Sequence, residues 1–447
     1  MNPLFRIDFS ISDSLKIVRK SVLIYDTIIF GIYDFTILFK NYIGNVYALT
    51  GVLAVFSTFC ICKRILMFNI YKTLLILIIL SINSSYTSIF PVEYSSLPIT
   101  WFLISIVVLI VVCFSNGIKK NIYFILSLLA VIYFVINLLW MKSNFINSLN
   151  QLINILLFLL IMCCVKNLVL NLSNIKHIEL TYFFFVEVML YSLMVIVAYI
   201  GYNNSKMFLG TIELMNNRTA YAATFADYSF STLYIATAMV VVVALIIKRK
   251  IKYNRVFWYG LLIIYTFAII AVNARTGIFA FAVSVGIIIF YESIVVHNIR
   301  ALLIVPVMLF IGIMMISITL QNRGGQNLLD SSGRIEGYRI ALDIFKDYFW
   351  VGTGFGIQNY SAITHMAIPH NLFIQYLVQF GIVGFIALLV VIVDIFHKTL
   401  KKRGVYIWAL LTIFLGAMLI PDILSSHYLI VILILALCCE DPINLVC

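Results

Sequence analysis

A polar segment from Gln321 to His370 stands out in a chain that is otherwise almost continuously apolar, and it holds the residue types that can do chemistry. It ends at Pro369-His370-Asn371, where the next apolar stretch begins. Cationic or titratable side chains and a glycine-rich turn lie within it: Arg323, Arg334, Arg339, Lys346 and His365, with Gly352, Gly354 and Gly356. Arg offers paired donors to phosphate and carboxylate oxygens, so the segment predicts a loop that binds an anionic ligand.

Apolar residues recur at helical spacing inside this segment, which predicts an amphipathic helix lying on the membrane surface. Its apolar face would consist of Ile335, Tyr338, Ala341, Leu342, Phe345, Tyr348 and Phe349. A cap for its start is available in Asp330, Ser331 or Ser332. Backbone amides at a helix start attract anions, so Arg334 in the first turn would stand beside an anion site. Arg339 is a full turn further in and is expected to pair with Asp343.

The elements that carry this loop must cross a membrane, because the composition does not fit a soluble core. Of the 447 residues 63% are hydrophobic and 11% charged, and the mean hydropathy is +1.09. A helix needs about 20 apolar residues to cross the hydrocarbon layer, and the chain divides into about fourteen such stretches. These are residues 21–39, 46–62, 73–90, 99–116, 121–140, 150–165, 180–200, 229–247, 256–273, 276–294, 301–319, 372–396, 405–420 and 428–440. We therefore expect an all-α polytopic integral membrane protein with one long extracytoplasmic loop, since unpaired backbone is not tolerated in lipid.

The orientation follows from Lys and Arg, which are retained in cytoplasmic loops. With the N-terminus inside, most of the 30 Lys and Arg fall in predicted cytoplasmic segments, and those outside concentrate at Arg275 and in the long loop. The eight Cys lie towards inner ends of spans or in the C-terminal tail, as expected when outer loops meet an oxidising environment. The net charge of +12 is spread thinly over the cytoplasmic loops, so nucleic acid is not an expected partner.

Residues 370–384 carry a family resemblance. His370-Asn371, nine residues, Gly381, two residues and Gly384 resemble the H-[N/S/Q]-x9-G-x-x-[G/T/Y] pattern of WaaL-type O-antigen ligases and Wzy-type O-antigen or capsular polysaccharide polymerases. Asn273-Ala274-Arg275-Thr276-Gly277 is similar to the family's S-R-[T/G]-G segment. Gly333-Arg334, with the amphipathic helix and the glycine turn, is similar to its loop helix, although Trp350 stands where a Pro is usual.

A fourth segment runs from Arg218-Thr219-Ala220 to Phe225-Ala226-Asp227-Tyr228 and resembles R-x-x-G-x-F-x-D-P-N-y, with Tyr228 and Ser229 in place of Pro-Asn. Each pattern alone has a structural explanation: Arg275 as an anchor at the membrane edge, Gly381 and Gly384 as sites of close helix packing. All four segments, however, fall on one predicted side of the membrane. The sequence thus divides into N-terminal transmembrane helices (1–200), a catalytic region (201–396) with the extracytoplasmic loop 321–371, and C-terminal transmembrane helices (397–447).

The resemblance implies a membrane glycosyltransferase that takes a saccharide chain from an undecaprenyl pyrophosphate carrier at the outer leaflet of the bacterial cytoplasmic (inner) membrane. It implies catalytic roles for His370, as general base towards an acceptor hydroxyl, and for Arg334 and Arg275, as stabilisers of the leaving pyrophosphate. Substrate contacts are expected from Arg218, Asp227, Arg339, Asn371 and Tyr338. No outer cluster of Asp, Glu or His has metal-ligand spacing, so we expect no metal and no cofactor.

Polymerase and ligase share this donor and differ in the acceptor, which is another lipid-linked repeat unit or a lipid A core. The predicted spans outnumber those usual for ligases and favour a polymerase in O-antigen or capsule biosynthesis, acting on an undecaprenyl-pyrophosphate-linked oligosaccharide in contact with membrane lipid. A chain-length regulator protein would be a further partner. The rival class is a transporter or flippase, which usually shows mid-membrane ionisable groups and an internal repeat. Here Asp26, Asp34 and Glu187 are the clear intramembrane acids, and the halves do not repeat.

Overall fold

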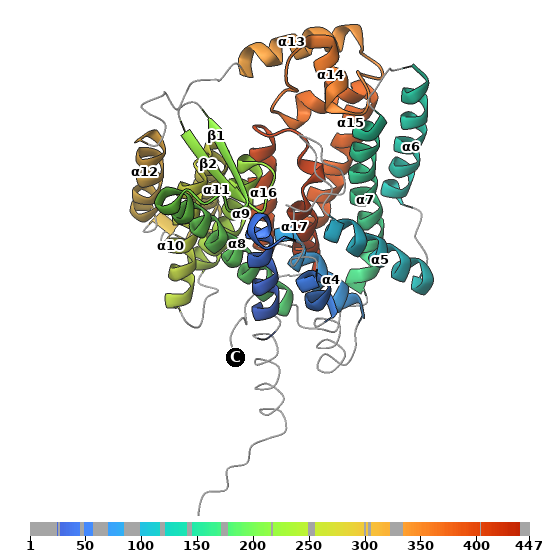
Figure 1. Ribbon diagram of the computed structural model, residues 1–447. Coiled ribbons are helices and arrows are strands. Elements are labelled where there is room, and N and C mark those ends of the chain that lie inside the picture. The colour runs from blue at the N-terminus through green and yellow to red at the C-terminus, as the bar shows by residue number, and fades with distance from the viewer. Residues whose placement is uncertain are drawn as a thin grey trace, which may run out of the picture.

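The computed structural model describes residues 25, 27–44, 49–56, 70–84, 99–116, 121–140, 145–170, 178–215, 218–248, 255–298, 301–302, 305–321, 334–402 and 404–438. This part of the chain is a helical bundle with a two-stranded sheet (Figure 1). The α-helices are α2 (Lys40–Ile43), α4 (Ile70–Leu80), α5 (Ile99–Asn116), α6 (Ile122–Trp140), α7 (Phe145–Leu170), α8 (Ile178–Ser205), α9 (Tyr228–Ile247), α10 (Arg255–Val272), α11 (Arg275–Phe290), α12 (Val305–Gln321), α13 (Arg334–Asp347), α14 (Ile357–Thr364), α15 (Leu372–Lys402), α16 (Tyr406–Ala417) and α17 (His427–Cys438). The strands and shorter helical turns are β1 (Thr211–Met215), β2 (Arg218–Ala223), η1 (Ile82–Ser84), η2 (Tyr291–Val295) and η4 (Ile423–Ser425).

Six helices of the described residues are long and apolar enough to cross a membrane, and six shorter apolar helices accompany them. Apolar side chains on the outward faces of α6 and α15, such as Leu139 and Val393, are exposed where lipid would lie. The protein is therefore a multi-pass membrane protein of the predicted helical class, with one small hairpin added. The number of fourteen spans remains a prediction, because several of the predicted spans extend beyond the described residues. The first of these spans contains Asp26, which also lies outside the described residues. The same holds for the first part of the long loop, residues 322–333.

Helix α9 is buried in the bundle, and α11 runs parallel to it. Near their starts, a Cβ atom on Gly277 would lie 2.5 Å from the backbone of Thr232, so glycine is what permits this close approach. At their other ends, Lys248 Nζ lies 3.6 Å from Glu292 Oε1. The first residues of both helices therefore lie at the same end of the bundle.

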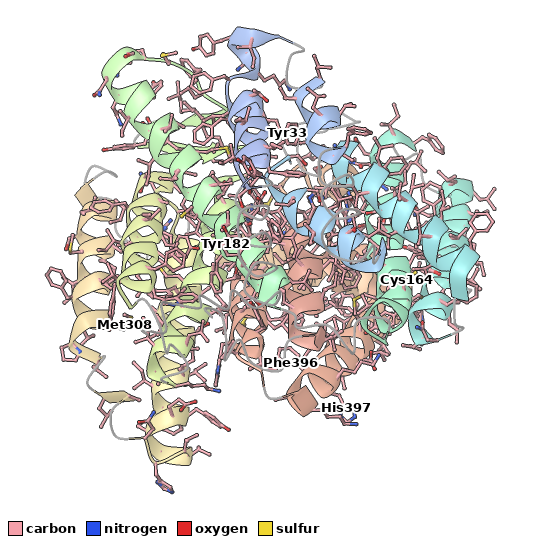
Figure 2. The ribbon with its side chains drawn as sticks, turned by 90° about the horizontal axis from the view of Figure 1, so that it is seen from below. Tyr33, Cys164, Tyr182, Met308, Phe396 and His397 are labelled. Carbon is pink, nitrogen blue, oxygen red and sulfur yellow. The ribbon has the colours of Figure 1, made fainter. Side chains whose placement is uncertain are left out.

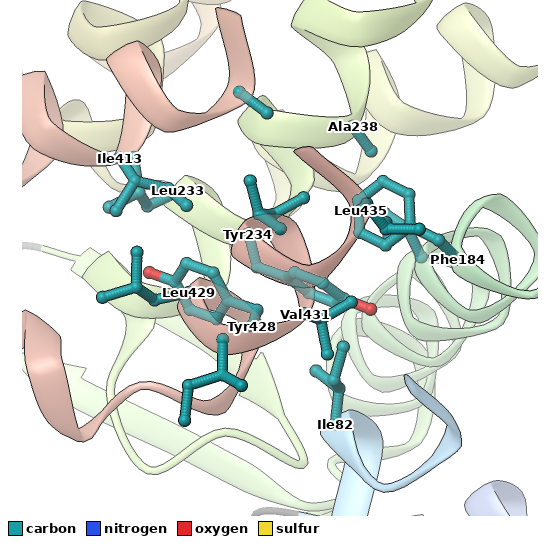
Figure 3. Packing of buried hydrophobic residues seen from close by; sticks show 14 of the residues in the cluster. Ile82, Phe184, Leu233, Tyr234, Ala238, Ile413, Tyr428, Leu429, Val431 and Leu435 are labelled. Atoms are coloured by element: carbon teal, nitrogen blue, oxygen red, sulfur yellow. The ribbon is translucent and has the colours of Figure 1, made fainter. Parts of the chain in front are cut away.

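Large buried side chains join α9 to its neighbours. Tyr234 of α9 and Tyr428 of α17 lie with ring centroids 5.4 Å apart, and Phe184 of α8 meets Tyr234 edge-on at 6.5 Å (Figure 3). Each of these side chains is fully buried, so it contributes its whole apolar surface to the core. Seen from the end opposite the loop, Tyr182 of α8 lies near the middle of the view and His397 of α15 at its edge (Figure 2).

A layer of loop structure covers the other end of the bundle. Helices α13 and α14 lie across the start of α15 (Figure 1), and a small core of their own holds them there: Ala341, Ile357, Tyr360, Ile368 and Val378. The antiparallel hairpin of β1 and β2, paired from Thr211 to Ala223, was not predicted. It is anchored on α8, because the Tyr191 hydroxyl donates to the Ala222 carbonyl at 2.7 Å.

Helix α15 is broken at Gly381, where φ is 62° and ψ is −165°. Backbone groups of the glycine turn occupy the break: Thr353 N donates to the Val378 carbonyl at 2.8 Å and Gly354 N to the Gln379 carbonyl at 2.7 Å. Gly352, Gly354 and Gly356 all have positive φ, which explains why this turn is glycine-rich. Gly381 thus does more than permit helix packing, since it opens the helix so that the loop can dock.

Candidate functional site

His370 lies immediately before the cap of α15. The next residue, Asn371, accepts the backbone N–H groups of Phe373 at 2.9 Å and Ile374 at 3.2 Å through its Oδ1 atom. Its Nδ2 group donates to the Met418 carbonyl at 3.2 Å. Asparagine is a preferred N-cap residue, and this one also ties α15 to the end of α16. The predicted contact of Asn371 with a sugar stays a prediction, while its structural role is clear.

The environment of His370 is set by two charged side chains from distant segments. The imidazole is half-buried, and its removal from water is the main cause that lowers the pKa of His370 below the ordinary 6.5. The Arg334 guanidinium lowers it further, and the Asp227 carboxylate opposes both. Asp227 lies more than a hundred positions before Arg334 and His370 in the sequence. His370 nevertheless interacts electrostatically with both.

Asp227 is the N-cap of α9. Its Oδ1 atom accepts the backbone N–H groups of Ser229 at 2.5 Å and Phe230 at 3.2 Å. Removal from water raises the pKa of Asp227, and the two amides and His370 oppose that rise. The carboxylate is thus held in one orientation by the helix that it caps, beside the imidazole.

Helix α13 brings Arg334 and Tyr338 to the same place. Arg334 is its first residue, and Tyr338, one turn later, donates from its hydroxyl to the His370 carbonyl at 3.0 Å. Burial raises the pKa of Tyr338, while Arg334 and Asn371 act in the opposite direction. The first turn of α13 therefore lies directly over the start of α15.

Arg275 begins α11 and is partly buried. The residue pair before it makes the turn: Asn273 has φ of 61°, and its Nδ2 group lies 3.5 Å from the Thr219 carbonyl of β2. Because α11 runs parallel to α9, Arg275 lies at the end of the bundle where Asp227 caps α9. Arg218 lies in β2 opposite Met215, and its side chain is outside the described residues.

Four helix starts therefore gather at one end of the bundle: those of α9, α11, α13 and α15. Each helix start carries partial positive charge on backbone N–H groups, which favours an anion nearby. Arg334 and Arg275 add positive charge at the starts of α13 and α11, whereas the starts of α9 and α15 are already capped by Asp227 and Asn371. The arrangement suits a ligand that carries negative charge, or that gains it during a reaction.

Arg339 is placed differently from this cluster. Its side chain is exposed, and the ion pair of Asp343 is formed with Lys346 at 2.7 Å. Lys346 is the main cause that lowers the pKa of Asp343, and Arg339 has only a weaker electrostatic effect. The predicted pairing of Arg339 with Asp343 is therefore wrong, because Asp343 pairs with Lys346. A role of Arg339 in substrate binding stays a prediction.

Two further features lie beside the site. The first is an apolar cavity of about 280 Å³ between α6, α7, α15 and the glycine turn, lined by residues that include Tyr133, Trp350, Phe355, Tyr376 and Phe380. It extends along α15 from Tyr376, five residues after Asn371, towards the far end of the helix, and it touches the turn through Trp350 and Val351. An apolar chain that lies in this cavity would thus lead to the cationic end of the bundle.

The second is a chain of buried amides. Gln151 of α7 donates to Gln379 at 3.1 Å, Gln375 donates to the same oxygen at 2.8 Å, and Gly356 N donates to Gln151 at 2.7 Å. Gln375 in turn accepts from Asp422 N at 2.5 Å. These bonds join α7, α15, the glycine turn and the loop before α17. Glutamines inside apolar spans are a signal that could have revealed this network from the sequence.

Comparison with known proteins agrees with this location. Residues 260–389 match the family model described as O-Antigen ligase, from within α10 to within α15. The match contains Arg275, Arg334 and His370 and begins after Asp227, so it is shorter than the region of resemblance in the sequence. No curated protein matches the chain. The match supports the resemblance of this part of the chain to the O-antigen polymerase and ligase superfamily.

Proposed function

We propose that the protein is a polysaccharide polymerase that joins undecaprenyl-pyrophosphate-linked oligosaccharide repeat units at the outer leaflet of the bacterial cytoplasmic membrane. The observation that carries the proposal is that the Arg334 guanidinium and the Asp227 carboxylate both act electrostatically on His370, at an end of the bundle where helix starts converge. The family match supports the reaction class, and the predicted excess of spans favours the polymerase.

In the proposed reaction His370 is the general base. Its lowered pKa keeps the imidazole neutral at neutral pH, so it can take the proton of the acceptor hydroxyl. The hydroxyl oxygen forms a bond to the anomeric carbon of the donor, and the bond from that carbon to the pyrophosphate oxygen breaks. Asp227 stabilises the imidazolium that results, in the way that a carboxylate supports a catalytic histidine. The proton then passes from His370 to solvent.

The leaving group of this reaction is undecaprenyl pyrophosphate, which gains negative charge as the glycosidic bond breaks. Arg334 and Arg275 would hold that charge with paired N–H donors, helped by the starts of α11 and α13. The apolar cavity along α15 would hold part of the polyprenyl chain, because its lining is almost wholly hydrophobic and it reaches the turn beneath α13.

A second candidate function is ligation of the finished chain to lipid A core. It is favoured by the description of the matching family, O-Antigen ligase. Ligase and polymerase would use the same His370, Arg334 and Arg275 and would differ in the hydroxyl that His370 deprotonates. The two functions therefore predict the same inactive variants and different products that accumulate in the cell.

The test is a surface-polysaccharide gel from a deletion strain complemented with the wild-type gene or with His370→Ala. Single repeat units at the surface without a long ladder would establish a polymerase, and long chains left on the lipid carrier would establish a ligase. His365→Asn is the matched control, since His365 is exposed in the same loop and Asn tolerates its left-handed backbone. A normal ladder with His370→Ala at wild-type protein level would overturn the assignment, and an unchanged ladder in the deletion strain would favour the transport class.

A further inference from the structure

A group of acidic and amide side chains is buried deep in the bundle, apart from the site around His370. Asp34, Asn83 and Glu187 have no exposed surface. Asn83 Nδ2 donates to Asp34 Oδ2 at 3.1 Å and to the backbone carbonyl of Glu187 at 3.1 Å. The two carboxyl groups are also close enough to interact electrostatically. One amide thus holds two acidic residues of different helices together.

Several oxygens of this group lack hydrogen-bond partners among the described residues: Asp34 Oδ1, Asn83 Oδ1, Glu187 Oε1 and Oε2, and Tyr234 Oη. Tyr234 is fully buried on α9, and it interacts electrostatically with both Glu187 and Asp34. Figure 3 shows its side chain reaching from α9 towards α8 and the segment that holds Ile82. Buried acceptors without donors are costly, and buried carboxylates without a counter-charge more so.

The backbone beside this group is irregular. Helix α4 ends at Leu80, and a buried 3₁₀ turn, Ile82–Ser84, carries Asn83 into the bundle. Ser81 Oγ and Ser84 Oγ donate to carbonyls within this segment, so the helix end is closed by its own hydroxyls. A helix end carries partial negative charge, which favours a cation. Broken helices inside membrane bundles are also where transporters bind Na⁺ or H⁺.

We propose that Asp34, Asn83, Glu187 and Tyr234 form a buried binding site for a monovalent metal cation, Na⁺. The donors are all oxygens, which hard cations prefer, and they come from four segments: residues 27–38, η1, α8 and α9. One Na⁺ balances the charge of one carboxylate, so the second carboxyl group keeps a proton, which an unpartnered oxygen of the site can accept. The donation by Asn83 to Asp34 also favours the ionised carboxylate.

This cation site is independent of the proposed glycosyl transfer. Tyr234 follows Asp227 by seven residues on α9, so the two sites are separated by roughly 10 Å along the helix. The ion would join α8 and α9, which carry the hairpin and Asp227, to the N-terminal helix 27–38. Its expected effect is on the stability of the folded chain rather than on the chemistry at His370.

The test uses the purified full-length protein in detergent. Binding of radioactive Na⁺ should be saturable with one ion per chain, and the unfolding temperature should rise with NaCl but not with choline chloride at equal ionic strength. Glu187→Gln and Asp34→Asn should each abolish the binding and the response to NaCl. Glu292→Gln is the matched control, because Glu292 is a buried acid that already has Lys248 as its partner. It should lower the unfolding temperature and keep the response to Na⁺.

Wild-type protein that is folded and binds no Na⁺ would overturn the proposal without any variant. An unfolding temperature that depends on pH but is the same in NaCl and choline chloride would show that the carboxyl groups hold protons. That result would also overturn the proposal. Should Glu187→Gln fail to fold, Asn83→Ala keeps both acids and removes one oxygen, and it should weaken Na⁺ binding at least tenfold. Unchanged binding in that variant would exclude Asn83 as a ligand and overturn the site as stated.

Discussion

The hydroxyl of Tyr338 donates a hydrogen bond of 3.0 Å to the backbone carbonyl of His370, and this bond fastens the first turn of α13 to the start of α15. Arg334 lies four residues before Tyr338, hence on the same face of α13. The bond therefore fixes where the Arg334 guanidinium stands relative to the imidazole. The electrostatic environment of His370 therefore depends on the relative position of the starts of α13 and α15.

Tyr338→Phe tests whether this hydrogen bond positions the two helix starts. The variant keeps the ring and removes the hydroxyl, and a hydrogen bond of this kind contributes about 1 kcal/mol, so we expect roughly fivefold slower glycosyl transfer. The measurement is the initial rate of polymer formation in membranes supplied with lipid-linked repeat units, at matched protein levels. Tyr348→Phe, at the other end of α13, is the control and should keep the wild-type rate. Equal rates for the two variants would show that the Tyr338 bond does not position the site.

Arg334→Gln should change both the rate and its dependence on pH. A general base works in its neutral form, so the rate falls as the pH drops through the pKa of His370. Arg334 lowers that pKa, and its loss lets the pKa rise, so the acid limb of the profile should move to higher pH. Loss of a charge-stabilising donor should also reduce the maximal rate by about 10²–10³-fold. Lys346→Gln, an exposed change on the same helix, should move neither quantity, and an unmoved acid limb in Arg334→Gln would contradict the assignment.

Asp227→Asn should move the acid limb the other way. Asp227 raises the pKa of His370, so its loss lowers the pKa and the limb should shift to lower pH. Asn caps a helix as well as Asp does, so α9 keeps its cap and only the charge is lost. Asp227→Ala additionally loses the cap and should cost about 1 kcal/mol of stability, seen as a lower unfolding temperature. A limb that moves to higher pH in Asp227→Asn would rule out the proposed pairing.

Local patterns explain what the sequence could predict. The amphipathic spacing after Arg334 depends only on helix periodicity, and the observed helix α13 begins at that residue and ends at Asp347. His370 was placed at the start of a span because a polar segment meets an apolar run there, and α15 begins two residues later. The apolar runs are expected to form helices because few other structures can span a membrane.

Long-range contacts explain what it could not. The hairpin of β1 and β2 was not predicted, although Asn216-Asn217 lies between two short runs of residues that favour strands. Asp227 was selected as a substrate residue, and its capping of α9 depends on where that helix begins. The break in α15 requires the glycine turn to be present beside it, and no periodicity in residues 372–396 indicates which turn will dock there.

Gly381→Ala tests whether that break positions the site. At φ 62° and ψ −165°, a residue other than glycine costs about 1–3 kcal/mol, and its Cβ would lie 2.4 Å from the backbone of Trp350. The glycine turn would have to leave α15, taking the segment between α13 and His370 with it. We expect little polymer and a lower unfolding temperature of the purified protein. Gly337→Ala is the control, because a Cβ there meets nothing within 4 Å and alanine favours the helix by up to ~1 kcal/mol. Normal polymer from Gly381→Ala would mean that the break is dispensable and that α13 and the Asn371 cap are sufficient to hold His370 in place.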